Sequence, residues 1–168
     1  MKNSFWCPCR ICIYGYGGHA KVIADTYISP DSEVAYFYED DLSLLSENKI
    51  SVKPGLTYGD QGFEIPLIPL VIGVGKNRIR QNIANSLNSF NARYAVATHP
   101  SANISDTATI GDGSVIFSNA VIQVGTEVGM HVIINTSASI DHECKISDFA
   151  HISPNATLCG NVTVGEGA

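Results

Sequence analysis

An aliphatic residue recurs at every sixth position through the second half of the chain, and this spacing constrains the fold more than any other feature. The eleven residues of the series are Ile104, Ile110, Ile116, Ile122, Val128, Ile134, Ile140, Ile146, Ile152, Leu158 and Val164. Four residues after each of them comes a mostly small residue, beginning with Ala108. A period of six fits neither an α-helix nor the alternation of an ordinary β-strand. It predicts a left-handed parallel β-helix of hexapeptide repeats, in which three repeats form one triangular coil.

The first half of the chain alternates short apolar runs with amphipathic segments. The apolar runs predict strands over residues 10–14, 33–38, 70–74 and 93–97, and the amphipathic segments predict helices over 21–28 and 76–88. Ile79, Ile83 and Leu87 are expected to form the buried face of the second helix. Residues 52–66 are rich in glycine and proline and are predicted to form a loop. The alternation predicts a small parallel α/β sheet of the Rossmann-like type.

Two domains are therefore expected. A Rossmann-like domain would span residues 1–97, and a β-helix domain would span residues 98–168. The boundary is placed at His99 and Pro100, because a proline disfavours helix in the residue before it. The repeat pattern is still intact at Ala168 with no capping segment after it, so the β-helix is expected to be incomplete at its C-terminal end.

Charge and composition exclude several classes of function. The net charge is −6 and the basic residues do not cluster, which argues against nucleic acid as a partner. The sequence has no long apolar run and no secretion signal, so we expect a cytoplasmic protein with reduced thiols and no membrane insertion. Cys7, Cys9 and Cys12 are spaced like part of a metal site, but the sequence has no second cysteine cluster, and no metal is expected.

A glycine-rich turn follows the first predicted strand. Gly15, Gly17 and Gly18 precede His19 at the start of the first predicted helix. Such a turn lets the backbone approach a pyrophosphate, and the helix N-terminus attracts the negative charge. Acidic residues after the second strand are placed to accept hydrogen bonds from a ribose or a base; these are Glu39, Asp40 and Asp41. The alternative is an ordinary strand-to-helix turn, with His19 only capping it.

The densest titratable group of the repeats is formed by Asp141, His142 and Glu143. A histidine can remove a proton near neutral pH, and an adjacent carboxylate can orient it. One coil later Gly160 is expected beside His142, where its N–H could stabilise an oxyanion. We expect His151 near the same edge. The alternatives are solvated surface histidines, or a zinc site that also includes His131, for which the histidine spacing is wrong.

Four segments of the chain resemble bacterial sugar acyltransferases that modify nucleotide-linked amino sugars and sialic acids. The segments are residues 13–22, 73–80, 99–102 and 135–144, of which the last is the most specific. The family combines hexapeptide repeats with a small Rossmann-like N-terminal domain. The sequence is most similar to UDP-4-amino-sugar N-acetyltransferases of the bacillosamine and perosamine kind.

The resemblance implies a homotrimer that uses acetyl-CoA as co-substrate and no metal. It makes His142 the general base with Glu143 beside it, and Gly160 the backbone donor. It places His151 and Gly160 near the acetyl donor. The nucleotide sugar, which is UDP-linked in the members that the chain most resembles, would contact Asn135, the turn from Gly15 to His19, and the acidic residues after the second strand.

Two alternatives remain open at this point. Family members continue for further coils that form much of the CoA groove, so this chain could be a trimeric module that binds a nucleotide sugar without chemistry. The acceptor could also be the hydroxyl group of a sialic acid, because nothing in the sequence separates an amine from a hydroxyl acceptor.

Overall fold

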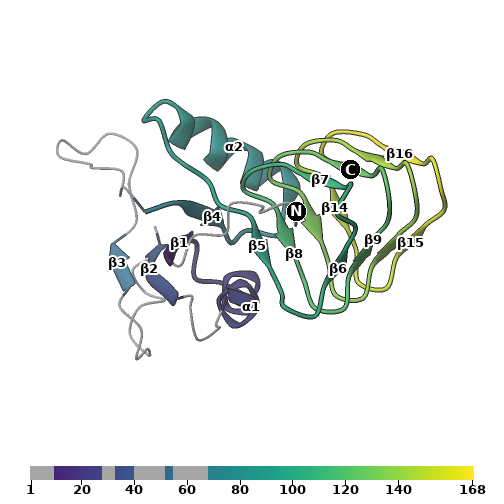
Figure 1. The fold of residues 1–168 in the computed structure, drawn as a ribbon. Helices are drawn as coiled ribbons and strands as arrows, with labels where there is room; N and C mark the ends of the chain where they lie inside the picture. Colours follow the sequence, from purple (N-terminus) through teal and green to yellow (C-terminus); the bar gives the residue numbers. More distant parts are fainter. Residues whose placement is uncertain (1–9, 28–32, 40–51, 55–67) are drawn as a thin grey trace.

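The structure is a computed structural model that describes residues 10–27, 33–39, 52–54 and 68–168. It contains a small α/β domain and a parallel β-helix that lie against each other (Figure 1). No helix in the described ranges is long and apolar enough to cross a membrane.

The N-terminal domain is built on a four-stranded parallel sheet with the order β3-β2-β1-β4. Its strands are β1 (Arg10–Tyr14), β2 (Glu33–Glu39), β3 (Val52–Pro54) and β4 (Leu70–Ile72). Helix α1 (Gly18–Tyr27) follows β1, and helix α2 (Asn77–Asn88) follows β4. Strands β1 and β4 are almost entirely apolar and buried, as expected for a parallel sheet covered on both faces.

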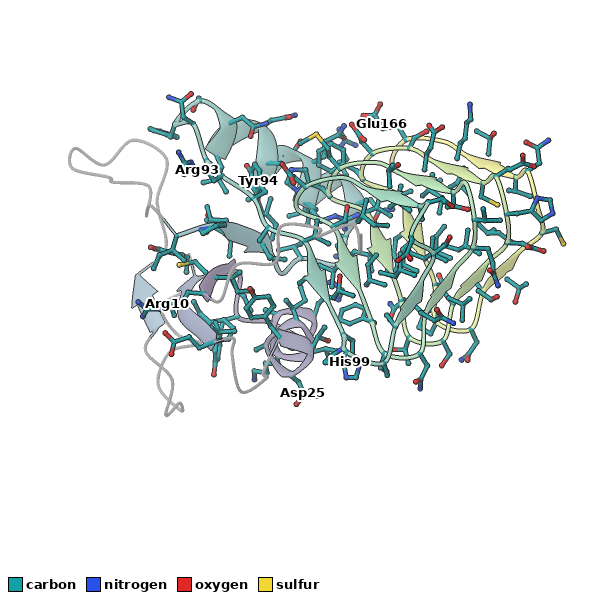
Figure 2. The ribbon with its side chains drawn as sticks, viewed as in Figure 1. Arg10, Asp25, Arg93, Tyr94, His99 and Glu166 are labelled. Atoms are coloured by element: carbon teal, nitrogen blue, oxygen red, sulfur yellow. The ribbon has the colours of Figure 1, made fainter. Side chains whose placement is uncertain are left out.

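Two expectations for this domain are wrong. Val52–Pro54 is a strand paired with β2 and not loop, while the rest of the predicted loop, 55–66, lies outside the described residues. Residues 93–97 do not form a last strand of this sheet. Tyr94, which is labelled in Figure 2, makes only an isolated bridge to Leu70, and the chain then enters the β-helix at β5 (Ala97–Thr98). The apolar run is shared between two structures, which its composition alone does not reveal.

Twelve two-residue strands form the β-helix. After β5 come β6 (Asn103–Ile104), β7 (Thr109–Ile110), β8 (Val115–Ile116), β9 (Val121–Ile122), β10 (Glu127–Val128), β11 (Ile133–Ile134), β12 (Ser139–Ile140), β13 (Lys145–Ile146), β14 (His151–Ile152), β15 (Thr157–Leu158) and β16 (Thr163–Val164). They stack into three parallel sheets of four strands each. We call β5, β8, β11 and β14 the junction sheet, β6, β9, β12 and β15 the second sheet, and β7, β10, β13 and β16 the third sheet.

The predicted β-helix is confirmed, and it begins one repeat earlier than the aliphatic series. Thr98 stands six residues before Ile104 and pairs with Ile116, as an aliphatic residue of the series would. It escaped the sequence pattern because it is polar. Every repeat position then aligns one coil on, as Ile134 does with Ile116 and Ile152.

The corners between strands repeat a single backbone conformation. One residue in each turn has a positive φ, and these residues recur every six positions from Gly113 to Gly167. Glycine and asparagine adopt this left-handed conformation at low cost, whereas most other residues do not. The occupants other than glycine and asparagine are His131 (φ 54°), Ser137 (φ 57°), Glu143 (φ 58°) and Phe149 (φ 60°).

The two domains share one apolar core. Ile23 and Tyr27 of α1 pack in a cluster that includes Val115 and Ile133 of the junction sheet. Helix α2 lies along the corner between the third sheet and the junction sheet, and its predicted apolar face is only partly buried. Leu87 is buried and Ile83 packs against the same cluster, whereas Ile79 is 45% exposed. Arg80 and Ala84 are the other buried residues of the helix. Arg80 is buried because it turns toward the carbonyl groups of that corner.

Candidate functional site

The first group of candidate residues lies at the corner between the second and third sheets. We call Asp141, His142, Glu143 and Gly160 the corner group. His142 Nδ1 lies 3.2 Å from Glu143 Oε2, and the His142 side chain is 52% exposed. The Asp141 carboxylate accepts the His142 N–H at 2.8 Å. A carboxylate that holds Nδ1–H leaves Nε2 without a proton, which is the state that a general base needs.

The His142 ring lies directly over Gly160. A β-carbon added to Gly160 would collide with Nε2 and with both ring carbons next to it. The Gly160 N–H has no hydrogen-bond partner within the part of the chain that the structure describes. An imidazole nitrogen and a backbone N–H without a partner thus lie close together at a partly exposed corner, as a general base and an oxyanion donor would.

Two small polar side chains inside the β-helix bond to the backbone of the turns that carry the corner group. Thr126 Oγ1 donates a hydrogen bond of 2.9 Å to the carbonyl of Asp141, immediately before His142. Cys144 Sγ lies 3.2 Å from the carbonyl of Cys159, immediately before Gly160. Both side chains are fully buried, so each turn is tied to the core of the β-helix.

The second group of candidate residues lies where the N-terminal domain meets the junction sheet. We call His19, Gly75, Asn135 and His151 the junction group. Asn135 Nδ2 lies 2.8 Å from His151 Nε2. A hydrogen bond with the backbone of Gly75 acts to raise the pKa of His151, but burial and the Arg80 cation outweigh it and lower that pKa. The ring centroids of His19 and His151 are 6.4 Å apart.

The expectation that His151 lies near the edge that carries His142 is wrong. His142 is in the turn between β12 and β13, at the corner of the second and third sheets. His151 is in β14, on the junction sheet. A corner of a triangular prism is opposite its third face, so the two histidines of one chain are on opposite sides of the β-helix. Counting residues along the chain missed this because a turn of the coil separates them.

His19 is enclosed between the domains rather than open to solvent. Its ring packs edge-on against Phe117, with ring centroids 5.3 Å apart. Its Nε2 is buried and has no partner among the described residues. Burial, followed by the neighbouring His151 and Arg80, lowers the pKa of His19 to about 4, so the ring is neutral at pH 7.

The glycine turn has the open backbone expected of a phosphate-binding loop. Gly15 has φ 101°, a conformation that a side chain would strain. A β-carbon added at Gly17 or Gly18 would meet nothing within 4 Å, so ligand atoms could approach both residues. Of the acidic residues expected to help, Asp40 and Asp41 lie outside the described residues. Glu39 is described only as the last residue of β2.

The three histidines of the alternative zinc site lie apart from one another within one chain. His131 is at the corner of the third sheet and the junction sheet, so His131, His142 and His151 occupy three different places on the β-helix. The described residues contain no group of three potential metal ligands. Cys12 is buried in β1, whereas Cys7 and Cys9 are outside the described residues.

Two buried residues next to the junction group were not predicted from the sequence to matter. His131 is 1% exposed and lies between Tyr94 and Phe149, with ring centroids at 4.4 Å and 5.1 Å. Arg80 is 1% exposed and donates hydrogen bonds to both domains. The signal for Arg80 was a charged residue inside segment 73–80, but residue order alone does not show that this position is buried.

Comparison with known proteins gives the same assignment along the whole chain. Residues 10–87 match the model of the PglD N-terminal domain. A UDP-N-acetylbacillosamine N-acetyltransferase from Bacillus subtilis (strain 168) is 37% identical over 120 residues, which is 70% of this chain and 52% of that protein. This chain therefore spans about half the length of that curated relative.

Solved structures agree with the sequence match. The acetyltransferase domain of PglB from Neisseria gonorrhoeae FA1090 is 33% identical with a TM-score of 0.84, over 95% of this chain and 78% of that one. PerB from Caulobacter crescentus, in complex with CoA and GDP-perosamine, is 28% identical with a TM-score of 0.80, over 93% of this chain and 74% of that one. The N-terminal domain followed by hexapeptide coils is thus the arrangement of known enzymes, and the chain belongs to the hexapeptide-repeat family of bacterial sugar acyltransferases.

Proposed function

We propose that the chain is an acetyl-CoA-dependent acetyltransferase that acts on the amino group of a nucleotide-linked amino sugar, most simply a UDP-4-amino-sugar. The observation that carries this proposal is the His142 ring, which is held over the unpartnered Gly160 N–H and has Glu143 at its Nδ1. The relatives support the choice of substrates. One is named for a UDP-linked amino sugar, and another holds CoA and GDP-perosamine.

In the proposed reaction, His142 Nε2 takes a proton from the sugar amine as the amine nitrogen attacks the thioester carbonyl. Glu143 stabilises the resulting imidazolium through Nδ1–H. The Gly160 N–H donates to the oxyanion of the tetrahedral intermediate. The C–N bond forms, the C–S bond breaks, and the electrons of the C–S bond leave with the CoA thiolate. The proton held by His142 then passes to the thiolate or to solvent.

The glycine turn is the proposed site for the nucleotide part of the acceptor. Gly17 and Gly18 leave the N-terminus of α1 open, where the partial positive charge of a helix attracts phosphate. His19 and Asn135 both lie beside His151 of the junction sheet, and they are proposed to contact the same acceptor. Glu39, Asp40 and Asp41 remain proposed contacts for the ribose or base.

The proposed active form is a homotrimer whose sites are shared between neighbouring copies. The corner group and the junction group of one chain are on opposite sides of the β-helix. A second copy can bring the corner group of one chain to the junction group of the next. A three-fold arrangement repeats that contact three times and closes.

CoA release measured by mass spectrometry tests the activity. Acetyl-CoA is mixed with a UDP-4-amino-sugar, with GDP-perosamine or with sialic acid, and with either the parent protein or its His142→Ala variant. We expect release with an amino sugar that depends on His142. Equal release from the parent and the variant would remove His142 as the base. Release only with sialic acid would indicate O-acetylation, and nucleotide-sugar binding without release would indicate a binding module.

Mixed trimers test whether the sites are shared. His142→Ala is expected to be inactive when expressed alone. At a nucleotide-sugar concentration well below KM, Asn135→Ala is expected to keep about a tenth of the parent rate. When both are expressed together, about a quarter of shared sites combine an intact corner group with an intact junction group, so about a quarter of the parent rate should return. No recovery in trimers shown to contain both variants would mean that each chain supplies both groups to its own site.

A further inference from the structure

Arg80 is a buried cation whose five N–H groups all face oxygen atoms of the protein. Its Nε donates to the carbonyl of His131 at 2.8 Å. Its Nη2 donates to the carbonyl of Phe149 at 2.8 Å and, at 3.4 Å, to that of Ala150. These three carbonyls belong to the β-helix. Within the described ranges no carboxylate bonds to this guanidinium, although buried arginines are usually paired with one.

The other half of the guanidinium holds the N-terminal domain. Nη1 donates to the carbonyls of Val74 and Gly75 at 3.0 Å and 3.2 Å, in the loop between β4 and α2. Nη2 also donates to Asn77 Oδ1 at 2.9 Å. One side chain therefore connects the loop after β4 with two successive turns of the β-helix.

Both groups of hydrogen bonds made by Arg80, to the β-helix and to the loop after β4, lie next to His151. Ala150, held by Nη2, directly precedes His151 in the chain. Gly75, held by Nη1, is the residue whose backbone forms a hydrogen bond with the His151 ring. Arg80 thus fixes the residue before His151 and also the loop whose backbone accepts the hydrogen bond of the His151 ring.

The neighbouring hydrogen bonds define the tautomer of His151. Asn135 Oδ1 accepts the Thr136 N–H at 2.8 Å, so the amide of Asn135 points its Nδ2 toward His151 Nε2. An amide NH₂ can only donate, so Nε2 must be the acceptor and the proton of the neutral ring is on Nδ1. A second proton on the ring would break the bond to Asn135.

We propose that Arg80 is a positioning residue for the transfer site, which acts through His151 to hold the Asn135 amide in its orientation toward the substrate. This inference rests on the proposed function, in which Asn135 contacts the nucleotide sugar. Arg80 touches no substrate itself. It fixes the ring by geometry, and its charge disfavours a second proton on that ring.

Nitrogen NMR of protein labelled with ¹⁵N-histidine tests the inference without an activity assay. The His151 signals are assigned with a His151→Gln variant. In the parent we expect a protonated Nδ1 and an unprotonated Nε2 at pH 8, where the ring is neutral. A parent His151 with its proton on Nε2 at this pH would overturn the proposal before any Arg80 variant is made.

Three variants then separate positioning from general stability. Arg80→Met removes the charge and all donors, and Arg80→Lys keeps the charge but cannot reach both domains with five donors. Arg78→Met is the matched control, because Arg78 is an exposed arginine on the same helix. We expect mixed tautomers in Arg80→Met, a smaller change in Arg80→Lys, and the parent spectrum in Arg78→Met. If Arg80→Met does not fold, Arg80→Lys decides, and an unchanged His151 spectrum in a folded variant overturns the proposal.

Kinetics on the same variants connect the spectrum to the site. Loss of one oriented hydrogen bond to the acceptor should raise the KM for the nucleotide sugar by about tenfold in Arg80→Lys, with a smaller change in the KM for acetyl-CoA. If the parent releases no CoA but the His151 spectrum still depends on Arg80, the proposed function fails and the positioning role stands. If the parent releases CoA but its His151 spectrum does not depend on Arg80, the proposed function stands and the positioning role fails.

Discussion

The imidazole of His142 lies directly over the α-carbon of Gly160, one coil further along the β-helix. Glycine is the only residue that leaves room for the ring in this position. Gly160→Ala should therefore push the ring away from the Gly160 N–H while the β-helix stays folded, because the exposed histidine can rotate. We expect the rate of CoA release to fall by about a hundredfold, as when a general base is lost.

Gly165→Ala is the control for this substitution. Gly165 is also in the last repeats, has no positive φ, and has nothing within 4 Å of an added β-carbon. Its rate and melting temperature should equal those of the parent. If Gly160→Ala kept the parent rate, the position of His142 in this structure would not be the catalytic one.

Glu143 combines a functional carboxylate with an unfavourable backbone conformation. Its φ of 58° favours asparagine, so Glu143→Asn should stabilise the fold by about 1 kcal/mol. The same change removes the carboxylate from His142 Nδ1 and should lower the rate of acetyl transfer. Glu143→Gln should lower the rate equally without any gain in stability. Thermal unfolding and CoA release measured on both variants check this exchange of stability for activity.

The junction between the domains should weaken in acid. Burial, followed by Arg80, lowers the pKa of His131 to about 4, while Asp148 acts in the opposite direction. Neither ring nitrogen has a partner among the described residues, and Tyr94, which faces the ring, stays neutral because burial raises its pKa to about 12. The folded state thus binds a proton less readily than the unfolded chain. Stability is complete above about pH 6.5 and is lost as the pH falls toward 4, by about 3 kcal/mol for this one group.

Urea unfolding between pH 7.5 and pH 4.5 measures this effect. His131→Phe keeps a ring between Tyr94 and Phe149 but cannot take up a proton. Its free energy of unfolding should depend less on pH than that of the parent. An unchanged pH dependence would assign the acid sensitivity to other groups, of which His19 is the first candidate.

Gly73 marks the closest approach between β4 and α1. A β-carbon there would lie 2.6 Å from Ala20 Cβ and 2.9 Å from both Ala20 Cα and Ile13 Cγ2. Gly73→Ala should therefore destabilise the protein by about 1–3 kcal/mol, as overpacking does. Gly17→Ala should leave stability unchanged, because its added methyl group meets nothing, yet it should weaken UDP-sugar binding measured by calorimetry. Equal effects of the two variants on unfolding would contradict the packing of α1.

The periodic half of the fold could be read directly from the sequence. Each aliphatic residue from Ile104 onward enters the same interior slot, and His142 lies over Gly160 because one coil separates them. Position along the coil is a local property. The predictions from the sequence were wrong where contacts between distant parts of the chain determine which side chains are buried. Thr98 fills an aliphatic slot, and the buried side of α2 is set by carbonyls of distant turns that attract Arg80.

The errors about histidines have the same cause. His151 follows His142 closely in the chain, but the intervening corner places it on another side of the prism. His131 reads as a solvated turn residue, yet the N-terminal domain covers its corner and encloses it. Sequence spacing reports which coil a residue occupies. It does not report which side of that coil another domain covers.

The fixed length of each coil limits how such a protein can change in evolution. Side chains stack at intervals of 18 residues, as Ser101 does on Asn119, and neighbouring strands are about 4.8 Å apart. A one-residue insertion would turn every later aliphatic residue out of the interior, while an insertion of a whole coil would preserve the pattern. The distance between the corner group and the N-terminal domain can therefore change only in steps of one whole coil. Acceptors of different length would have to be accommodated by loops.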